Sequence, residues 1–359
     1  MAHTPQATAS APISTDGLII GAGSTGLFQA FELGLLGVHA HIVDVLPYAG
    51  GQCMELYPDK PIFDIPGVPA CTGRELTANL LRQVAPFAPT FHWEQQVSSL
   101  QRQEDGDFRV ETAQGICFLA KTVFIAAGVG AFVPRTLQLP GLNALQHPQI
   151  AYAATDPHVY AGKKVLILGD NDAALACALR LSHDNACATQ AAHVTLVHRR
   201  DHFVADAALQ AQFRERVQAQ KIDFYAGQIT GYDAPLDRIQ ALTITQPDAS
   251  QIAVPVDALL VFWGLSPKLG PISDWGLAME RKQLQVDTEK FETSERGIFA
   301  VGDINTYPGK KKLILCGFHE STLAAFAAAA IIFPEKKIML QYTTSSTQLQ
   351  QALGVSKTA

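Results

Sequence analysis

A glycine-rich segment near the start of the chain constrains the fold more than any other feature of this sequence. Gly21, Gly23 and Gly26 form a GxGxxG pattern between a short apolar run, 18–20, and a helical pattern over 27–36. The first glycine permits a tight turn, the second lets a pyrophosphate approach the backbone, and the third lets the helix pack closely on the strand. The segment therefore predicts a strand–turn–helix unit whose helix N-terminus faces phosphates.

A second strand and an acidic residue complete this unit. Residues 39–43 are expected to form the next strand, and Asp44 follows it directly. A carboxylate at this place can accept hydrogen bonds from a ribose diol. The complete pattern predicts dinucleotide binding, although a glycine-rich turn alone would also suit an ordinary parallel α/β domain.

Length and composition are typical of a globular protein with two domains. The chain has 359 residues, of which 48% are hydrophobic and 17% are charged, so it can bury two cores. Its net charge of −6 argues against nucleic acid as a partner. The longest nearly continuous apolar run, 323–333, is too short to span a membrane, so we expect no membrane partner.

The termini and the cysteines bear on location and chemistry. Residues 1–14 are small and polar and are expected to form a disordered leader rather than a signal peptide. The six cysteines are scattered, without a CxxC pair or zinc-ligand spacing, which predicts no metal site and no dithiol catalysis. Reduced thiols favour a cytoplasmic location.

The rest of the first domain is expected to enclose a flat ligand. Gly50 and Gly51, followed by Gln52, predict a loop that lets such a ligand lie against the backbone. A helix is predicted over 73–84, and short antiparallel strands over 91–100, 108–112 and 116–119. A separate buried strand over 121–128 ends in small residues, which leave space beside a cofactor.

A second unit repeats the opening pattern after a proline-rich linker that begins at residue 133. A strand over 164–168, a turn that starts at Gly169, a helix over 175–181 and a strand over 193–197 are predicted in that order. Where the first unit ends in an acid, this one ends in Arg199 and Arg200. An acid suits a ribose 2′-hydroxyl and arginine suits a 2′-phosphate, so the contrast predicts FAD in the first unit and NADPH in the second.

The second turn departs from the glycine pattern. Asp170 and Asn171 stand where glycines are expected, and Asp170 brings a negative charge close to the predicted pyrophosphate site. The alternative therefore stays open that this unit is structural and binds nucleotide poorly or not at all.

The chain is expected to return to the first domain near residue 291. A strand over 293–303 ends at Asp303, whose carboxylate can anchor a ribityl hydroxyl, although a helix cap or turn acid would look the same. A helix over 320–332 is expected to point its N-terminus at the flavin ring. The predicted domains are thus 15–132 with 291–359 for FAD, and 133–290 for NADPH.

Several motifs together resemble one family along nearly the whole chain. The segments 21–28, 50–67, 198–201, 302–310 and 312–318 are similar to those of the thioredoxin-reductase-like ferredoxin–NADP(+) reductases. The resemblance implies an α/β fold of two Rossmann-like, three-layer dinucleotide-binding domains. It implies a homodimer whose C-terminal segment covers the flavin, with Tyr57 and Tyr342 near the isoalloxazine. The residues that it implies for FAD are Thr25, Asp44, Gln52, Tyr57, Val97, Phe132, Asp303 and Thr344, with Thr343 one residue away as the alternative to the last.

The resemblance implies that hydride passes from NADPH to FAD and that single electrons pass on to ferredoxin or a similar small iron–sulfur protein. Direct hydride transfer needs no general acid or base, so no catalytic side chain is predicted. Lys310, Lys311 and Lys312 are candidates for docking an acidic ferredoxin, or they form only a solvated loop. The alternatives are an FAD enzyme that uses NADH or another acceptor, such as a quinone or flavodoxin, and a non-catalytic flavin-binding dimer.

Overall fold

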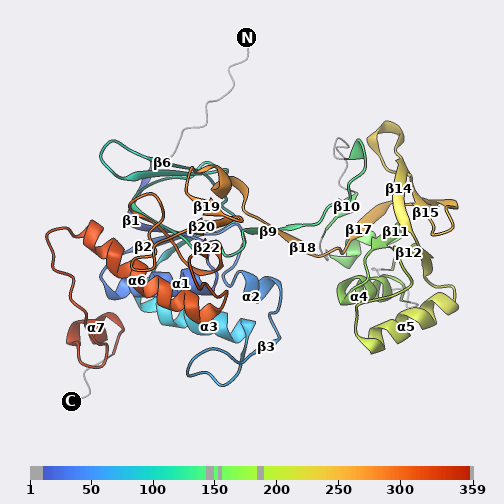
Figure 1. The fold of residues 1–359 in the computed structure, drawn as a ribbon. Coiled ribbons are helices and arrows are strands. Elements are labelled where there is room, and N and C mark those ends of the chain that lie inside the picture. The colour runs from blue at the N-terminus through green and yellow to red at the C-terminus, as the bar shows by residue number, and fades with distance from the viewer. Residues whose placement is uncertain (1–10, 143–148, 153–155, 184–189, 356–359) are drawn as a thin grey trace, which may run out of the picture. The chain divides into compact units, whose positions relative to one another are not determined.

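The computed structural model describes residues 11–142, 149–152, 156–183 and 190–355. The chain divides into two compact units (Figure 1). The first unit combines the residues up to Phe132 with those from Pro267 onward, and the second unit is Val133–Ser266. The first boundary lies where the sequence placed it, but the return lies at residue 267 instead of 291. Segment 267–290 belongs to the first unit because Ile272, Leu277 and Leu284 are buried in its core.

A seven-stranded sheet forms the centre of the first unit. Its order is β5-β2-β1-β8-β7-β6, with β21 also paired to β8. Pairing is parallel from β5 to β8 and for β21, and antiparallel for β8-β7-β6. The strands are β1 (Ile13–Ile20), β2 (Ala40–Val43), β5 (Thr90–His92), β6 (Val97–Arg102), β7 (Phe108–Thr112), β8 (Cys117–Ile125) and β21 (Ile298–Ala300).

Two details of this sheet correct the sequence prediction. β1 begins at Ile13, where Ile13 and Ser14 pair with β8, so the predicted leader cannot extend to residue 14. Its first ten residues lie outside the described part of the chain. The strands predicted separately over 116–119 and 121–128 are one strand, β8, because the exposed Lys121 interrupts the apolar pattern without breaking the strand.

Each face of this sheet is covered, which gives three layers. The helices α1 (Ser24–Leu35), α3 (Gly73–Val84) and α6 (Ile314–Ile332) pack on one face (Figure 1). The other face is covered by apolar residues of segment 269–286. β1 shows this alternation, since Ile19 belongs to the helical side and Leu18 and Ile20 belong to the opposite side.

Helix α6 is longer than the apolar run that the sequence predicted to be too short for a membrane span. Its 19 residues are long and apolar enough to cross a bilayer by length and composition alone, which the shorter predicted run, 323–333, was not. In this fold α6 packs against α1, and its Glu320 and Ser321 are both fully buried and hydrogen-bonded within the first unit.

Short elements complete the first unit. They are α2 (Gln52–Glu55), β3 (Pro61–Ile62), β4 (Cys71–Thr72), η1 (Ala85–Phe87), η5 (Gly270–Asp274), β19 (Met279–Glu280), β20 (Gln283–Gln285), η6 (Gly302–Ile304), β22 (Asn305–Thr306) and α7 (Thr347–Ala352). The chain passes between the units in β9 (Ala131–Pro134) and β18 (Leu265–Lys268), which pair with each other.

The second unit repeats the parallel core of the first. Its sheet has the order β10-β17-β11-β12-β13, and every pair is parallel. The run β17-β11-β12-β13 matches β8-β1-β2-β5 in the first unit, so the predicted internal repeat is confirmed. A separate antiparallel sheet, β14-β15-β16, follows β13. The elements are β10 (Ile150–Ala151), η3 (Pro157–Tyr160), β11 (Lys164–Leu168), α4 (Asp172–Leu181), β12 (His193–His198), α5 (Ala207–Gln218), β13 (Asp223–Ala226), β14 (Gln228–Asp233), η4 (Pro235–Asp237), β15 (Ala241–Thr245), β16 (Gln251–Pro255) and β17 (Ala258–Val261).

Candidate dinucleotide sites

A cavity in the first unit, here called the first-unit cavity, gathers most of the predicted site residues. They come from six separate stretches of sequence, and the fold of the parallel sheet brings them together at the carboxyl ends of its strands. The predicted residues that line this cavity are Gly21, Gly23, Thr25, Asp44, Gly51, Gln52, Tyr57, Val97, Phe132 and Asp303.

The glycine turn between β1 and α1 is as tight as the sequence predicted. A Cβ atom on Gly21, whose φ is +110°, would lie 2.5 Å from the carbonyl oxygen of Ala126. Gly26 does not line the cavity but packs behind the turn, where a Cβ atom would lie 1.9 Å from the carbonyl oxygen of Gly21. Gly23 is the N-cap of α1, and no described side chain caps this helix. Its first N–H groups are therefore left for a ligand.

Asp44 is held rigidly at the end of β2. Its Oδ2 accepts a hydrogen bond from the N–H of Ala22 at 2.6 Å, and its Oδ1 accepts one from Leu46 at 2.8 Å. Burial raises the pKa of this carboxyl group, and the backbone hydrogen bonds act in the opposite direction. Because each carboxylate oxygen has further lone pairs, the group can also accept from a ribose diol.

Gln52 connects two distant segments in the lining of the cavity. Its Nε2 donates to Oδ2 of Asp303 at 3.2 Å, across 251 positions of the sequence. Tyr57 lies near the buried Cys53, with 3.8 Å between the hydroxyl oxygen and the sulfur, and burial raises the pKa of the tyrosine. The loop after β2 and the turn after β21 thus form one wall.

Thr25 lies where α1, α6 and the Gly302 turn come together. A Cβ atom on Gly317 would lie 2.5 Å from Oγ1 of Thr25, and one on Gly302 would lie 2.9 Å from it. The two glycines therefore allow α6 and the turn to approach the cavity-lining threonine.

Sequence reasoning missed part of the cavity wall. Leu269, Ile272 and Trp275 line the cavity, yet they fall in the segment that the sequence assigned to the second domain. The signal was their spacing of three residues, which suits the short 3-10 helix η5 found there.

Three predicted residues in the C-terminal tail do not line the first-unit cavity. Tyr342, Thr343 and Thr344 precede α7 and are exposed, with Tyr342 67% accessible. A single chain does not bring them to the other predicted FAD residues, and their roles stay predictions.

The second unit places its predicted residues at one edge of its sheet. Gly169 follows β11, and Arg199 and Arg200 follow the neighbouring β12, with both arginines exposed. The turn is closed by one side chain, that of Asn171. Oδ1 of Asn171 accepts from the N–H of Ala174 at 3.1 Å, and Nδ2 donates to the carbonyl oxygen of Phe262 at 2.8 Å.

Asp170 faces a histidine rather than open solvent alone. Its Oδ2 lies 3.6 Å from Nε2 of His198, at the end of β12. Burial lowers the pKa of His198, Arg199 and Arg200 lower it further, and Asp170 opposes them. The negative charge of Asp170, which the sequence prediction counted against nucleotide binding, thus lies among positive or protonatable groups.

The fold and these two sites define a class of protein with two dinucleotide-binding units in one chain. The family model described as "Pyridine nucleotide-disulphide oxidoreductase" matches residues 15–316, and the chain belongs to this family. Within it, the chain belongs with the ferredoxin–NADP reductases. It is 58% identical to the ferredoxin–NADP reductase of Albidiferax ferrireducens over 344 residues, which are 96% of this chain and 97% of that one. It is 57% identical to that of Polaromonas naphthalenivorans, covering 96% and 93%.

Solved structures show the same fold at low sequence identity. Lactococcus lactis thioredoxin reductase, in the FR conformation, has a TM-score of 0.56 and 22% identity, covering 89% of this chain and 99% of that one. The bacillithiol disulfide reductase Bdr of Staphylococcus aureus has a TM-score of 0.59 and 16% identity, covering 90% and 100%. These likenesses confirm the predicted two-domain α/β fold.

Proposed function

We propose that the chain is a flavoenzyme that transfers electrons between NADPH and ferredoxin, with FAD in the first-unit cavity. The observation that carries the proposal is the convergence of the uncapped glycine turn, Asp44 and Asp303 on one cavity. A bound flavin would supply the chemistry, since it accepts a hydride and releases electrons one at a time. The names of the relatives support ferredoxin and NADP as the reaction partners.

Two groups of residues in the cavity lining support FAD as the flavin. The turn at Gly23 offers N–H groups to a pyrophosphate, and Asp44 offers its carboxylate to the ribose of an adenosine. Gln52 and Asp303 lie in the same lining and suit a ribityl chain. A dinucleotide flavin would use both groups of residues, whereas a mononucleotide would leave Asp44 without a ligand.

The second unit is proposed to bind NADPH through Gly169, Arg199 and Arg200. Arginine guanidinium groups suit a 2′-phosphate, and these two are exposed at the end of β12. Asp170, which stands with Asn171 in place of the expected glycines, is the feature that leaves open the alternative of a non-catalytic second unit. NADH is a separate alternative to NADPH as the nucleotide.

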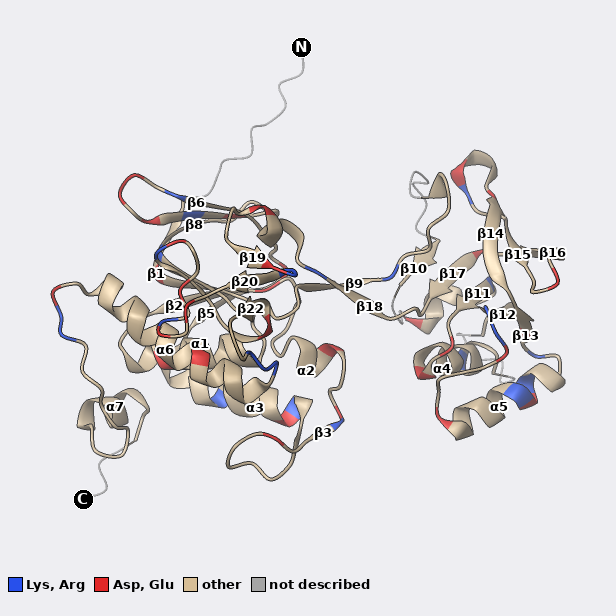
Figure 2. Ribbon diagram, in the orientation of Figure 1, with Lys and Arg blue, Asp and Glu red and all other residues tan. Residues whose placement is uncertain are grey.

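The proposed ferredoxin-binding surface contains two of the three lysines that the sequence suggested. Lys310 is only 6% exposed and forms an ion pair with Glu320, so it is not available for docking. Lys311 and Lys312 are exposed in the basic loop before α6 (Figure 2). Lys312 also lines the first-unit cavity, next to the exposed Leu313. These two lysines are the candidates for attracting an acidic iron–sulfur protein toward the flavin.

A homodimer in the cytoplasm remains part of the proposal. Met339, Leu340 and Tyr342 are 64–67% exposed in the tail, as expected of apolar residues that meet a second copy. In such a dimer Tyr342, Thr343 and Thr344 would complete the flavin site of the other copy. Sedimentation of the holoprotein tests the dimer.

Anaerobic reduction of the purified protein tests the function. We expect a yellow protein whose visible absorbance bleaches with NADPH faster than with NADH, and then returns when oxidised ferredoxin is added. A colourless protein that takes up no FAD on reconstitution contradicts the flavin assignment. A yellow protein that neither nucleotide reduces would favour the non-catalytic alternative.

A further inference from the structure

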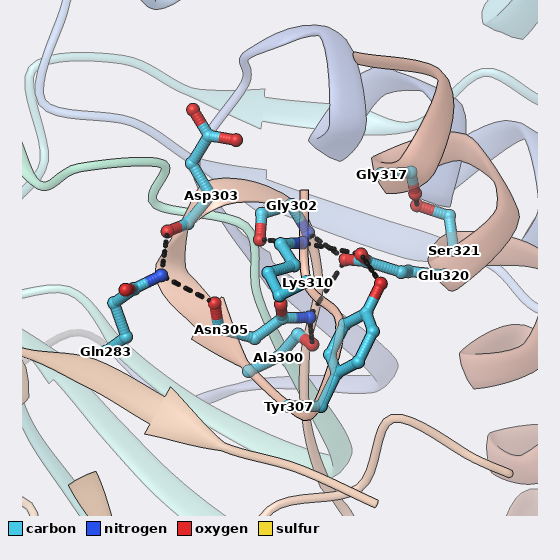
Figure 3. Close-up of polar contacts among 10 residues, drawn as sticks. All are labelled: Gln283, Ala300, Gly302, Asp303, Asn305, Tyr307, Lys310, Gly317, Glu320 and Ser321. Atoms are coloured by element: carbon cyan, nitrogen blue, oxygen red, sulfur yellow. Dashed lines mark hydrogen bonds and ion pairs between the residues drawn. The ribbon is translucent and has the colours of Figure 1, made fainter. Parts of the chain in front are cut away.

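A buried carboxylate lies beside the first-unit cavity and has no part in the proposed electron transfer. Glu320 of α6 is fully buried, and each of its two carboxylate oxygens accepts two hydrogen bonds (Figure 3). Oε2 accepts from the N–H of Gly302 at 2.7 Å and from Nδ2 of Asn305 at 2.8 Å. Oε1 accepts from Nζ of Lys310 at 2.5 Å and from the hydroxyl of Tyr307 at 2.9 Å.

Lys310 holds the same turn from its other side. Its Nζ also donates to the carbonyl oxygen of Gly302 at 2.8 Å and lies 5.3 Å from the ring centroid of Tyr307. The N–H and the carbonyl group of Gly302 are therefore both engaged by this one ion pair (Figure 3). The orientation of the backbone at Gly302 is fixed by side chains from α6 and from the loop before it.

Asp303 is the next residue, and it faces the cavity. Its carboxylate accepts from Gln52, and its carbonyl oxygen accepts from Nε2 of Gln283 at 3.2 Å. A change in the backbone direction at Gly302 would redirect the Asp303 side chain, because the two residues share a peptide group.

The energetics of burial favour a geometric role for the pair. Removing two charges from water costs about as much as their attraction returns, so a buried ion pair adds little net stability. A carboxylate whose four acceptor positions are all used has, however, one well-defined orientation. The ion pair therefore contributes a fixed orientation of the Gly302 turn rather than net stability.

We propose that Lys310 and Glu320 are positioning residues of the flavin site: they hold the backbone of Gly302 on both sides and so fix the direction in which Asp303 meets the cofactor. The proposal rests on the proposed function, because it takes FAD as the ligand of this cavity. Neither residue lines the cavity, so both act through the turn.

The paired variant Lys310→Met/Glu320→Gln tests this role without leaving one buried charge alone. The glutamine oxygen can still accept a hydrogen bond from the N–H of Gly302. Methionine fills the space of the lysine hydrocarbon chain but cannot donate to the carbonyl oxygen of Gly302. We expect the dissociation constant of FAD, measured by titrating apoprotein, to rise about tenfold. The visible spectrum of the bound flavin should also shift, because its polar surroundings change.

A double-mutant cycle separates positioning from general loosening. In an Asp303→Ala background, the paired variant should change the FAD dissociation constant less than about twofold, since the group that it positions is gone. The matched control is Thr322→Ala, in the same helix. Its hydroxyl donates to the carbonyl oxygen of Phe318 and not to the Glu320 cluster, so FAD binding should stay within about twofold of wild type.

Two binding results overturn the proposal and are distinguishable. If wild-type apoprotein binds no FAD, the proposed function and this inference both fail. If wild type binds FAD and the paired variant binds it equally well, only the inference fails. Should the variant not fold, hydrogen exchange of wild-type apoprotein decides: a protected Gly302 amide supports a preformed turn, and rapid exchange that FAD alone suppresses refutes it.

Discussion

The two glycine turns of this chain have the same place in their sheets but different chemistry. In the first unit, Gly23 is the N-cap residue of α1, and no described side chain caps the helix. In the second, the side chain of Asn171 caps α4 and also binds the backbone at Phe262. The first turn thus leaves its N–H groups for a ligand, whereas the second is closed by the side chain of Asn171.

This difference matches the two roles proposed for the nucleotides. A resident cofactor can form part of the structure, because the turn that binds it need not be stable without it. A nucleotide that must leave after each reaction is better served by a turn that keeps its shape when empty. We infer that the second turn gives up affinity for a preformed site that can exchange its ligand.

The largest expected effect comes from the glycine that packs behind the first turn. Gly26→Ala should abolish FAD binding and destabilise the first unit by about 1–3 kcal/mol or more, because its Cβ would collide with Gly21. The corresponding residue of the second unit is already Ala174. Ala174→Gly should cost only about 1 kcal/mol, as for any helix glycine. Flavin content and thermal melting of both variants measure the difference between the two substitutions. A Gly26→Ala protein that keeps its full flavin content would contradict the prediction.

The next effect concerns the residues at which the second strands end. Arg199→Ala/Arg200→Ala should weaken NADPH binding about tenfold or more and leave NADH binding nearly unchanged, because only NADPH carries the 2′-phosphate. Titration with both nucleotides measures this ratio. Arg74→Ala is the control, since Arg74 forms an exposed ion pair with Asp59 in the first unit. Equal losses for NADPH and NADH would mean that these arginines do not distinguish the phosphate.

A smaller effect is expected at Asp170. Asp170→Asn removes a negative charge near the proposed pyrophosphate and should tighten NADPH binding about threefold. The same titration measures it, with raised salt reducing the difference. Weaker binding by Asp170→Asn would show that the pair with His198 helps to shape the site. If wild type binds no NADPH but Asp170→Gly/Asn171→Gly does, the non-catalytic alternative gains support.

The smallest effect concerns pH and the strand pairs next to the turns. Nδ1 of His41 lies 2.9 Å from Nε2 of His92 across β2 and β5, whereas His193 meets Asp223 across β12 and β13. Burial, followed by His92 and His39, lowers the pKa of His41 to about 4. The unfolded chain therefore binds the proton more readily, and this contribution to stability, complete above pH 6.5, is lost as the pH falls toward 4.

Denaturant unfolding at a series of pH values tests this last prediction. His41→Gln should flatten the loss of stability between pH 6.5 and 4, and the part of this loss that His41 causes should persist in His193→Gln, which leaves the imidazole pair in place. An unchanged slope in the His41→Gln variant would show that the imidazole pair does not set the acid sensitivity of the first unit.

Local patterns predicted the repeated units well because their signals lie in short stretches. The glycine turn, the helix over 73–84 and the strand over 164–168 were all found where the sequence placed them. Lys310 and segment 267–290 were misjudged for one shared reason: the residues that bury them are far away in the sequence and are known only from the fold. A lysine run resembles solvated surface until a buried acid, Glu320, comes to face it, and that partner is known only from the fold.

The site followed the same division. That Asp44, Gly21 and Gly23 gather at one site could be predicted from their own strand and turn, and the same holds for Gln52 and Asp303 from the motifs around them. Their binding roles stay predictions. The hydrogen bond between Gln52 and Asp303 joins residues far apart in sequence and required the structure. The tail residues Tyr342 to Thr344 remain untested, since one chain does not place them in the cavity.

The position of β21 in the chain has a consequence for synthesis on the ribosome. The sheet of the first unit needs this strand, which pairs with β8 but is made only after the whole of the second unit. The second unit is continuous and can fold while the rest is still being translated. We therefore expect the flavin to be captured last, once the C-terminal part has emerged, so that nascent chains halted before β21 are protease-resistant in the second unit alone.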